Sequence, residues 1–267
     1  MSTLQEITDP SAIRLDISAS TWQEAMDAAG SLLAESGACG TTYPEAMIQT
    51  VIDKGPYIVI APGFAFAHSR PTEDVTRTGM AWIRLQEPVA FGHSSNDPVS
   101  LIAALSATDN QQHIASMKQL SRLLGDESRR AQLDSATSPQ EFYDALDIES
   151  AGKSPEPQAA DSSPRPKERS ASTKNKILTV CGNGLGTSLF LKNTLEQVLD
   201  HWGWSPYLTV EATDTISAKG KAKEADLILT SGEIARALGD LGVPVRVVEN
   251  FTSMREIDAV MRDSYDI

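Results

Sequence analysis

Residues 149–175 constrain this 267-residue chain more than any other feature. The stretch holds four prolines and no Ile, Leu, Val, Met, Phe, Tyr or Trp. Such a composition buries too little apolar surface to offset the entropy lost on ordering. We therefore expect a flexible linker between two domains, at 1–148 and 176–267. The linker is either a plain spacer or a tether that keeps the domains at a high effective concentration.

Charge and composition exclude several classes of protein. With 23 basic and 36 acidic residues the net charge is −13, which opposes binding to nucleic acid. The chain has no run of 18 apolar residues and its start lacks the pattern of a secretion signal. Its two cysteines, Cys39 and Cys181, are too few for a disulfide framework, which suits a reducing compartment. From these three observations we expect a soluble cytoplasmic protein.

The first domain alternates patterns typical of helices and of strands. Apolar residues three and four apart predict four helices, at 22–36, 42–52, 111–124 and from Ser138-Pro139 onward. In the second of these, Thr42 and Glu45 have the spacing of a capping box. Apolar runs predict three strands, at 57–61, 78–85 and 99–106. These elements indicate a mixed α/β domain.

The second domain is more regular. Apolar runs predict four strands, at 177–180, 207–210, 225–230 and 243–248. Helices are expected at 187–199 and 253–261. This alternation predicts a small Rossmann-like domain with a four-stranded parallel sheet, whose site lies beyond the carboxyl ends of the strands.

Cys181 stands at such a strand end and is followed by a glycine-rich segment that runs into a helix. The segment consists of Gly182, Asn183, Gly184, Leu185, Gly186, Thr187 and Ser188. Its backbone N–H groups and the helix N-terminus are suited to hold a phosphate dianion, and the two hydroxyls can donate to the same oxygens. The same field favours the thiolate form of Cys181, the form that attacks phosphorus.

Other interpretations of this segment fit less well. A Walker loop needs a lysine before Thr187, and a dinucleotide fingerprint needs glycine at that position, although Glu211 stands where a ribose ligand would. A cysteine phosphatase needs arginine at the same position. Without that charge, a phosphocysteine is expected to persist until an acceptor arrives. A buried structural cysteine before a glycine turn stays an alternative.

His68 lies in a segment, 57–71, that is expected to end a strand and enter a loop. A neutral histidine nitrogen can both attack phosphorus and leave from it near pH 7. Arg70 could screen the phosphoryl charge, and His113, which follows another strand end, could face His68 across one pocket. A hydrogen-bonded structural histidine is the alternative.

Longer motifs surround these residues in both domains. In the first domain they are residues 55–63, 67–71, 88–92, 96–99 and 107–113, and in the second they are residues 177–188. By these motifs the first domain resembles enzyme IIA (EIIA) of the mannitol/fructose superfamily in the bacterial phosphoenolpyruvate-dependent sugar phosphotransferase system (PTS), within it the ascorbate type. The second resembles the ascorbate/lactose-like enzyme IIB (EIIB) family.

The resemblance implies a phosphotransferase. We expect neither a cofactor nor a metal, since no cluster of Cys and His has the spacing of metal ligands. The resemblance also implies that His68 accepts the phosphoryl group from the carrier protein HPr, that His113 supports it, and that Cys181 takes it next. Cys181 would pass it to a sugar on a separate membrane enzyme IIC (EIIC), with which the chain would associate peripherally. Two departures stand out: Ala67 replaces a common proline, and 49–53 lacks the arginine of mannitol-type members.

The remaining residues with reactive side chains carry no pattern. His93 and His201 lack the spacing of metal ligands, and Cys39 is expected to be an ordinary thiol.

A regulatory phosphoprotein that reports sugar flux is the alternative function. The sequence does not identify the sugar, the oligomeric state (a homodimer included), or whether His68 reaches Cys181 of its own chain.

Overall fold

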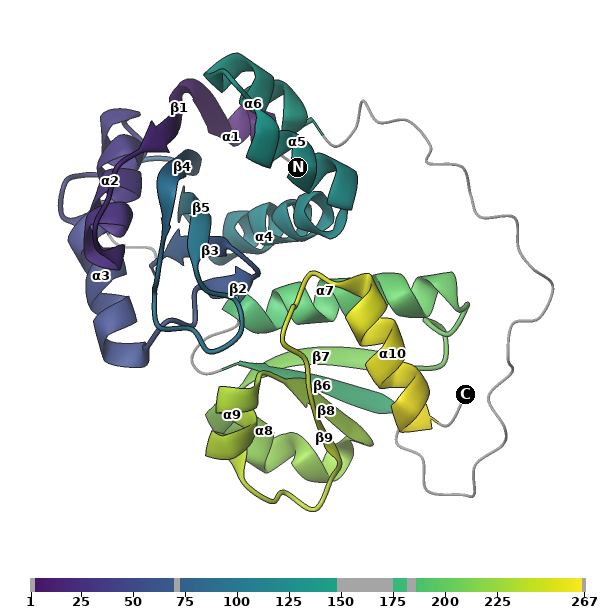
Figure 1. Ribbon diagram of the computed structural model, residues 1–267. Helices are drawn as coiled ribbons and strands as arrows, with labels where there is room; N and C mark the ends of the chain where they lie inside the picture. The colour runs from purple at the N-terminus through teal and green to yellow at the C-terminus, as the bar shows by residue number, and fades with distance from the viewer. Residues whose placement is uncertain (1–2, 70–72, 148–174, 182–185, 266–267) are drawn as a thin grey trace. The chain divides into compact units, whose positions relative to one another are not determined.

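The computed structural model describes residues 3–69, 73–147, 175–181 and 186–265 (Figure 1). The chain divides into two compact units, Met1–Ile148 and Glu149–Ile267. The predicted linker, apart from Asn175, lies outside the described residues. Among the residues that are described, no helix is long and apolar enough to cross a membrane.

The first unit is built on a mixed five-stranded sheet in the order β1-β4-β5-β3-β2. The strands are β1 (Thr8–Ile17), β2 (Val59–Ala61), β3 (Phe64–His68), β4 (Gly79–Val89) and β5 (Val99–Ser106). The β1–β4 and β3–β5 pairs are parallel, whereas the β4–β5 and β2–β3 pairs are antiparallel. The mixed α/β class predicted from the sequence is confirmed.

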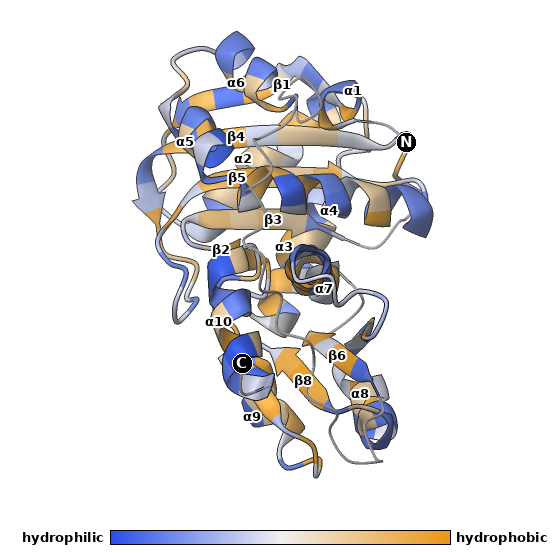
Figure 2. Ribbon diagram, turned by 90° about the vertical axis from the view of Figure 1, so that its right-hand side faces the viewer, coloured by the Kyte–Doolittle hydropathy of each residue, from blue (hydrophilic) through white to orange (hydrophobic). Residues whose placement is uncertain are grey.

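Helices cover both faces of this sheet. They are α1 (Leu4–Ile7), α2 (Trp22–Glu35), α3 (Tyr43–Lys54), α4 (Asn110–Gly125), α5 (Glu127–Ser135) and α6 (Pro139–Ala145). Helices α2 and α3 lie on one face, and α4, α5 and α6 lie on the other (Figure 1). Apolar residues run along the central strands β4, β5 and β3 between these layers (Figure 2).

The alternation of β3 sets the direction in which His68 points. The strand reads Phe-Ala-Phe-Ala-His, and successive side chains of a strand point to opposite faces. Ala65 and Ala67 pack with the core cluster of α2 and α3. Phe64 contacts the ring of Trp82, and Phe66 stacks on His68. His68 therefore shares the aromatic face of the strand, the face that α4 to α6 cover.

Two expectations for this unit are wrong. His68 was expected in a loop, but it is the last residue of β3, because Gly63 at a φ of +68° turns the chain between β2 and β3 and starts a second strand. The Thr42 side chain makes no capping bond, because its hydroxyl donates to Asp74 at 2.5 Å. Sequence reasoning also missed β1, an edge strand in which half of the residues are exposed.

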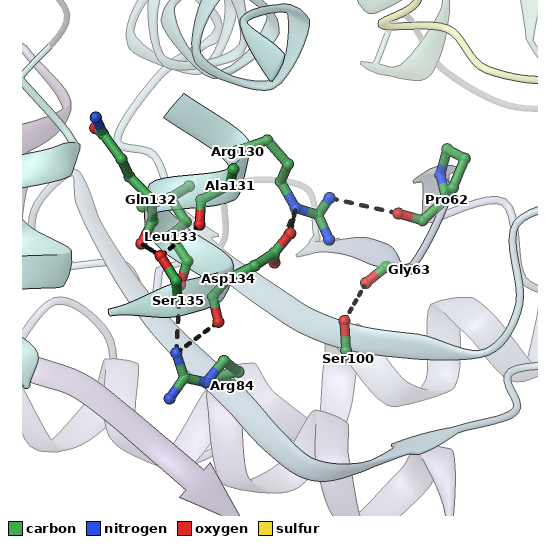
Figure 3. A network of polar contacts seen from close by, with 10 residues as sticks. All are labelled: Pro62, Gly63, Arg84, Ser100, Arg130, Ala131, Gln132, Leu133, Asp134 and Ser135. Carbon is green, nitrogen blue, oxygen red and sulfur yellow. Dashed lines mark hydrogen bonds and ion pairs between the residues drawn. The ribbon is translucent and has the colours of Figure 1, made fainter. Parts of the chain in front are cut away.

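Two arginines tie α5 to the sheet (Figure 3). Arg84 of β4 donates to the carbonyl oxygens of Leu133, Asp134 and Ala136 at the end of α5, at 3.4, 3.0 and 2.7 Å. It also pairs with Asp16 of β1 at 3.0 Å. Arg130 of α5 reaches back to the Pro62 carbonyl at 3.4 Å. These cations satisfy carbonyl groups that a helix end and a turn leave open.

Replacing Arg84 by methionine is expected to lower the free energy of unfolding of the first unit by about 2–3 kcal/mol. The side chain is 15% exposed, so the carbonyls and Asp16 lose a partner that water replaces only in part. Urea denaturation measures the change. As a control, Arg122→Met removes an exposed arginine of α4 and is expected to cost less than about 0.5 kcal/mol. Equal losses in the two variants would contradict this role.

The second unit has a four-stranded, all-parallel sheet, as predicted, and its strands lie in the order β7-β6-β8-β9. The strands are β6 (Lys176–Cys181), β7 (Thr209–Asp214), β8 (Leu227–Thr230) and β9 (Val245–Val247). The helices are α7 (Gly186–His201), α8 (Thr215–Lys221), the 3-10 turn η1 (Ala222–Glu224), α9 (Gly232–Leu238) and α10 (Met254–Tyr265). Helices α7 and α10 lie on one face, and α8 and α9 on the other (Figure 1).

Alternation along β6 gives each face its core. Leu178 and Val180 pack with the cluster that includes Ala218 of α8 and Leu238 of α9. Thr179 points to the opposite face, where its hydroxyl donates to the Ser188 carbonyl of α7 at 3.0 Å. Cys181, two residues further along, shares the α7 face. Sequence reasoning missed α8 and α9, which have only seven residues each and so too short a helical period to detect.

Candidate phosphoryl-acceptor sites

His68 is a buried histidine at the carboxyl end of β3, with 8% of its surface exposed. Its Nδ1 lies 2.9 Å from the carbonyl oxygen of Phe66. Because a carbonyl only accepts hydrogen bonds, this geometry assigns the proton of the neutral ring to Nδ1. The lone pair is then on Nε2, which makes Nε2 the nucleophilic atom.

Three rings surround His68. Phe66 stacks on it with a centroid separation of 4.8 Å, and Tyr57 meets it edge-on at 5.9 Å. The ring of His113, from the first turn of α4, lies 5.3 Å away. The structure thus brings together the two histidines that the sequence singled out. The aromatic contacts restrict the orientation of the His68 ring, so Nε2 has a defined direction of attack.

His113 adds an unusual polar atom to this site. In the described part of the chain its buried Nε2 has no hydrogen-bond partner. Burial lowers the pKa of His113 below its usual value, so the ring is neutral near pH 7. A buried polar atom without a partner is costly in a native fold, and a ligand that arrives during function can satisfy it. A phosphoryl oxygen on His68 is such a ligand.

Replacing His113 by phenylalanine is expected to make the first unit less sensitive to acid. Because the pKa of His113 is lower in the folded state, the unfolded chain takes up a proton first as the pH falls below about 6.5. The wild type therefore loses stability between about pH 7.5 and about pH 5.5, and the variant should lose less. Urea denaturation at the two pH values checks this, with His201→Phe as an exposed control. Parallel losses in all three proteins would contradict it.

The start of α3 holds the chain on both sides of residues 70–72. The Tyr43 hydroxyl accepts a hydrogen bond from the Ser69 N–H at 3.2 Å. The Asp74 carboxylate accepts from the Thr42 N–H at 3.2 Å and from its hydroxyl. Sequence reasoning assigned neither Tyr43 nor Asp74 to the site. Tyr43 is buried, and a buried tyrosine hydroxyl needs a hydrogen-bond partner, which is the signal that could have pointed to it. Arg70, predicted to screen the phosphoryl charge, lies outside the described residues.

Cys181 is the last residue of β6 in the second unit and is 3% exposed. It pairs in register with Asp214, the last residue of β7. On the other side Val180 pairs with Thr230, whose hydroxyl donates to the Val180 carbonyl at 2.7 Å. The cysteine therefore lies at the carboxyl edge of a parallel sheet, where folds of this kind place ligands.

The predicted phosphate loop is described only in part. Residues 182–185, that is Gly182, Asn183, Gly184 and Leu185, lie outside the described residues. Gly186 begins α7, a helix of 16 residues. Thr187 and Ser188 follow in its first turn, and both are buried. The N-terminus of a long helix thus follows Cys181 within five residues, which agrees with the segment expected from the sequence.

Two carboxylates of β7 have defined partners: Asp214 at the carboxyl edge beside Cys181, and Glu211, which pairs in register with Leu178 nearer the opposite edge. Asp214 caps α8 by accepting from the N–H groups of Ile216 and Ser217, both at 2.8 Å. Hydrogen bonds from the Ser217 backbone and side chain lower the pKa of Asp214, so it stays ionised and is unsuited to protonate a leaving group. Glu211, the candidate ribose ligand, forms ion pairs with Lys176 and Lys221.

The other singled-out residues have structural surroundings. His93 Nδ1 accepts from the N–H groups of Ser95 and Asn96, at 3.2 and 3.1 Å. Burial, with the nearby Asp74 carboxylate, raises the pKa of Cys39 to about 11, so its thiol is unreactive near neutral pH. Within the described ranges, no group of three or more His, Cys, Asp or Glu side chains could hold a metal ion.

Comparison with protein families gives one match for each unit. Residues 6–148, more than half of the chain, match the family described as phosphoenolpyruvate-dependent sugar phosphotransferase system, EIIA 2. The chain belongs to this EIIA family. Residues 176–263 match the PTS lactose/cellobiose-specific IIB subunit family. The chain is therefore an EIIA–EIIB component of a sugar phosphotransferase system, as the motifs around His68 and Cys181 had suggested.

Curated relatives and solved structures agree for the EIIA unit. The ascorbate-specific PTS EIIA components of Salmonella typhimurium and Escherichia coli K12 are 34% identical over 148 residues, which cover 55% of this chain and 96% of each relative. A putative PTS IIA domain from Streptococcus pyogenes is 33% identical with a TM-score of 0.50, covering 55% of this chain and 94% of its own. The mannitol-specific cryptic enzyme IIA of Escherichia coli is also 33% identical, with a TM-score of 0.50, and the match covers 54% of this chain and 98% of its own.

Proposed function

We propose that this chain is the cytoplasmic EIIAB component of an L-ascorbate phosphotransferase system, which relays a phosphoryl group from phospho-HPr to His68, then to Cys181, and then to the sugar on a separate membrane EIIC. The geometry of His68 carries this proposal, because its Nδ1–H is bonded to Phe66 and its Nε2 holds the lone pair. The substrate class is supported by the curated EIIA relatives from Salmonella typhimurium and Escherichia coli K12, which are ascorbate-specific, whereas one solved EIIA structure of similar identity is mannitol-specific.

In the first transfer the Nε2 lone pair of His68 attacks the phosphorus of phospho-HPr. A new N–P bond forms as the P–N bond of the carrier breaks, and the electron pair returns to the carrier's imidazole. A neutral His113 in its Nε2–H tautomer donates to a phosphoryl oxygen, which satisfies the buried Nε2. Both the attacking atom and the leaving atom are imidazole nitrogens, so the bond that forms and the bond that breaks are of the same kind. Catalysis of this step therefore depends on positioning rather than on a strong driving force.

In the second transfer the Cys181 thiolate attacks the same phosphorus. The S–P bond forms, the P–N bond breaks, and His68 regains its lone pair on Nε2. The segment 182–188 and the N-terminus of α7 stabilise the dianion on sulfur. Asp214 stays ionised, so no acid assists hydrolysis from this position, and the phosphocysteine survives until a sugar hydroxyl attacks it.

The segment 149–175 serves this relay as a tether. A segment of this length and composition is expected to keep the two units at an effective concentration on the order of millimolar. When the transfer runs within one chain, it needs no search for a partner in solution. Peripheral association with EIIC delivers the phosphocysteine to the sugar.

The test is incubation of the chain with radiolabelled phosphoenolpyruvate, enzyme I and HPr. Label on the chain that requires all three partners is the expected result, and absence of label under conditions that phosphorylate another EIIA would overturn the proposal. Ascorbate uptake in a strain that lacks the chain separates transport from regulation. Unchanged uptake would contradict a role in transport and favour a phosphoprotein that reports sugar flux.

A further inference from the structure

The hydroxyl of Tyr43 lies within hydrogen-bonding distance of three backbone groups at the end of β3. It accepts from the Ser69 N–H at 3.2 Å and lies 3.0 Å from the Leu105 carbonyl oxygen and 3.1 Å from the Ser69 carbonyl oxygen, either of which can take its proton. The side chain is buried at the first position of α3, and burial raises its pKa to about 12. The group is therefore a neutral phenol that both donates and accepts.

This placement interrupts the β3–β5 ladder. His68 and Leu105 are the last paired residues of these parallel strands. In a parallel ladder the N–H one residue beyond a paired residue can reach the partner's carbonyl, and here that donor is Ser69. Ser69 donates to the Tyr43 oxygen instead, and that oxygen contacts the Leu105 carbonyl. The phenol takes the place of one direct ladder bond, so β3 ends at His68.

We propose that Tyr43 is a positioning residue for His68, because its hydroxyl stops the ladder at this histidine and fixes the direction in which the chain leaves it. This inference rests on the proposed function of His68 as phosphoryl acceptor. The bond from Nδ1–H to the Phe66 carbonyl fixes the His68 ring, and the bond from the Ser69 N–H to Tyr43 fixes the backbone that follows it. The hydroxyl of Thr42, the residue before Tyr43, donates a hydrogen bond to the Asp74 carboxylate, five residues after Ser69.

Tyr43→Phe keeps the buried ring and removes only the hydroxyl. The Ser69 N–H and the Leu105 carbonyl can then bond directly, which changes the backbone at Ser69 and moves His68 relative to its phosphoryl donor. We expect kcat for phosphorylation by phospho-HPr to fall about tenfold or more, with KM within about twofold, because misplacement of a reacting atom affects chemistry more than carrier binding. A kcat equal to that of the wild type would overturn the proposal.

Tyr143→Phe is the matched control. Its hydroxyl is 3.4 Å from the Gln5 carbonyl and belongs to α6, and its removal should leave kcat unchanged. NMR of the unphosphorylated protein supplies a readout that needs no phosphodonor. We expect the Ser69 amide and the His68 ring signals to shift in Tyr43→Phe and to stay in place in Tyr143→Phe. Unshifted signals in Tyr43→Phe would overturn the proposal even if the chain proves not to accept phosphate from HPr.

Hydrogen exchange in the wild type covers the case in which Tyr43→Phe does not fold. The Ser69 amide is bonded to a buried phenol, so it should exchange much more slowly than an unstructured amide. Exchange of Ser69 at the rate of an unstructured peptide would overturn the proposal.

Discussion

In the His68→Ala protein, labelling of both units by phosphoenolpyruvate, enzyme I and HPr is expected to fall to background. Alanine has no nucleophilic atom, and the methyl group leaves Phe66 and Tyr57 in place around the lost ring. If the relay runs from His68 to Cys181, the second unit loses its donor at the same time. Phosphorus NMR measures the outcome, since phosphorus bonded to nitrogen and phosphorus bonded to sulfur resonate apart.

The control is His201→Ala, which removes an exposed histidine in the last turn of α7. This variant should carry label on both units as the wild type does. Undiminished labelling of Cys181 in the His68→Ala protein would contradict the proposed order of transfer from His68 to Cys181, because the thiol would then take its phosphoryl group from a donor other than His68.

In the Cys181→Ser protein, label is expected to remain on His68 and to be lost from the second unit. A serine hydroxyl is a far weaker nucleophile than a thiolate near neutral pH. Phosphate should therefore accumulate on His68 as a dead-end species, and delivery to the sugar should stop. Phosphorus NMR of the chain and ascorbate uptake by cells that carry the variant measure the two effects.

Cys39→Ser is the matched control, because it makes the same exchange at a buried thiol with a raised pKa in the first unit. It should leave both labels intact. If Cys181→Ser also lost the label on His68, the two residues would not act in succession, and the relay would need another order.

Much of the fold follows from the order of residues along the chain. The helices at 22–35 and 110–125 and the strands at 99–106 and 176–181 have strong apolar periods, and the predicted elements agree with them to within one or two residues. The parallel sheet of the second unit was predictable because strands and crossovers alternate there with regular spacing. Two other elements were not: α9, with seven residues, is too short to show a helical period, and β1 contains Asp9 and Pro10, residue types that are depleted in strands.

The nucleophiles themselves were also visible in the sequence. Cys181 stands before a glycine-rich segment at a strand end, and His68 lies in a motif with Arg70. Their neighbours were not all visible: Tyr43 looked like the start of a helix, and Thr42 looked like its cap. A hydrogen bond between residues 26 positions apart leaves no periodic mark in a sequence.

The sequence by itself determined that this chain has two α/β domains and two candidate phosphoryl acceptors, because apolar periodicity and the nucleophiles' local motifs depend on neighbouring residues. Only the tertiary structure decided which nitrogen of His68 holds the lone pair, that His113 lies beside it with a buried Nε2, and that Tyr43 ends the strand there. These features depend on the packing of α3, α4 and β5 around β3, and packing brings together atoms that the chain keeps far apart.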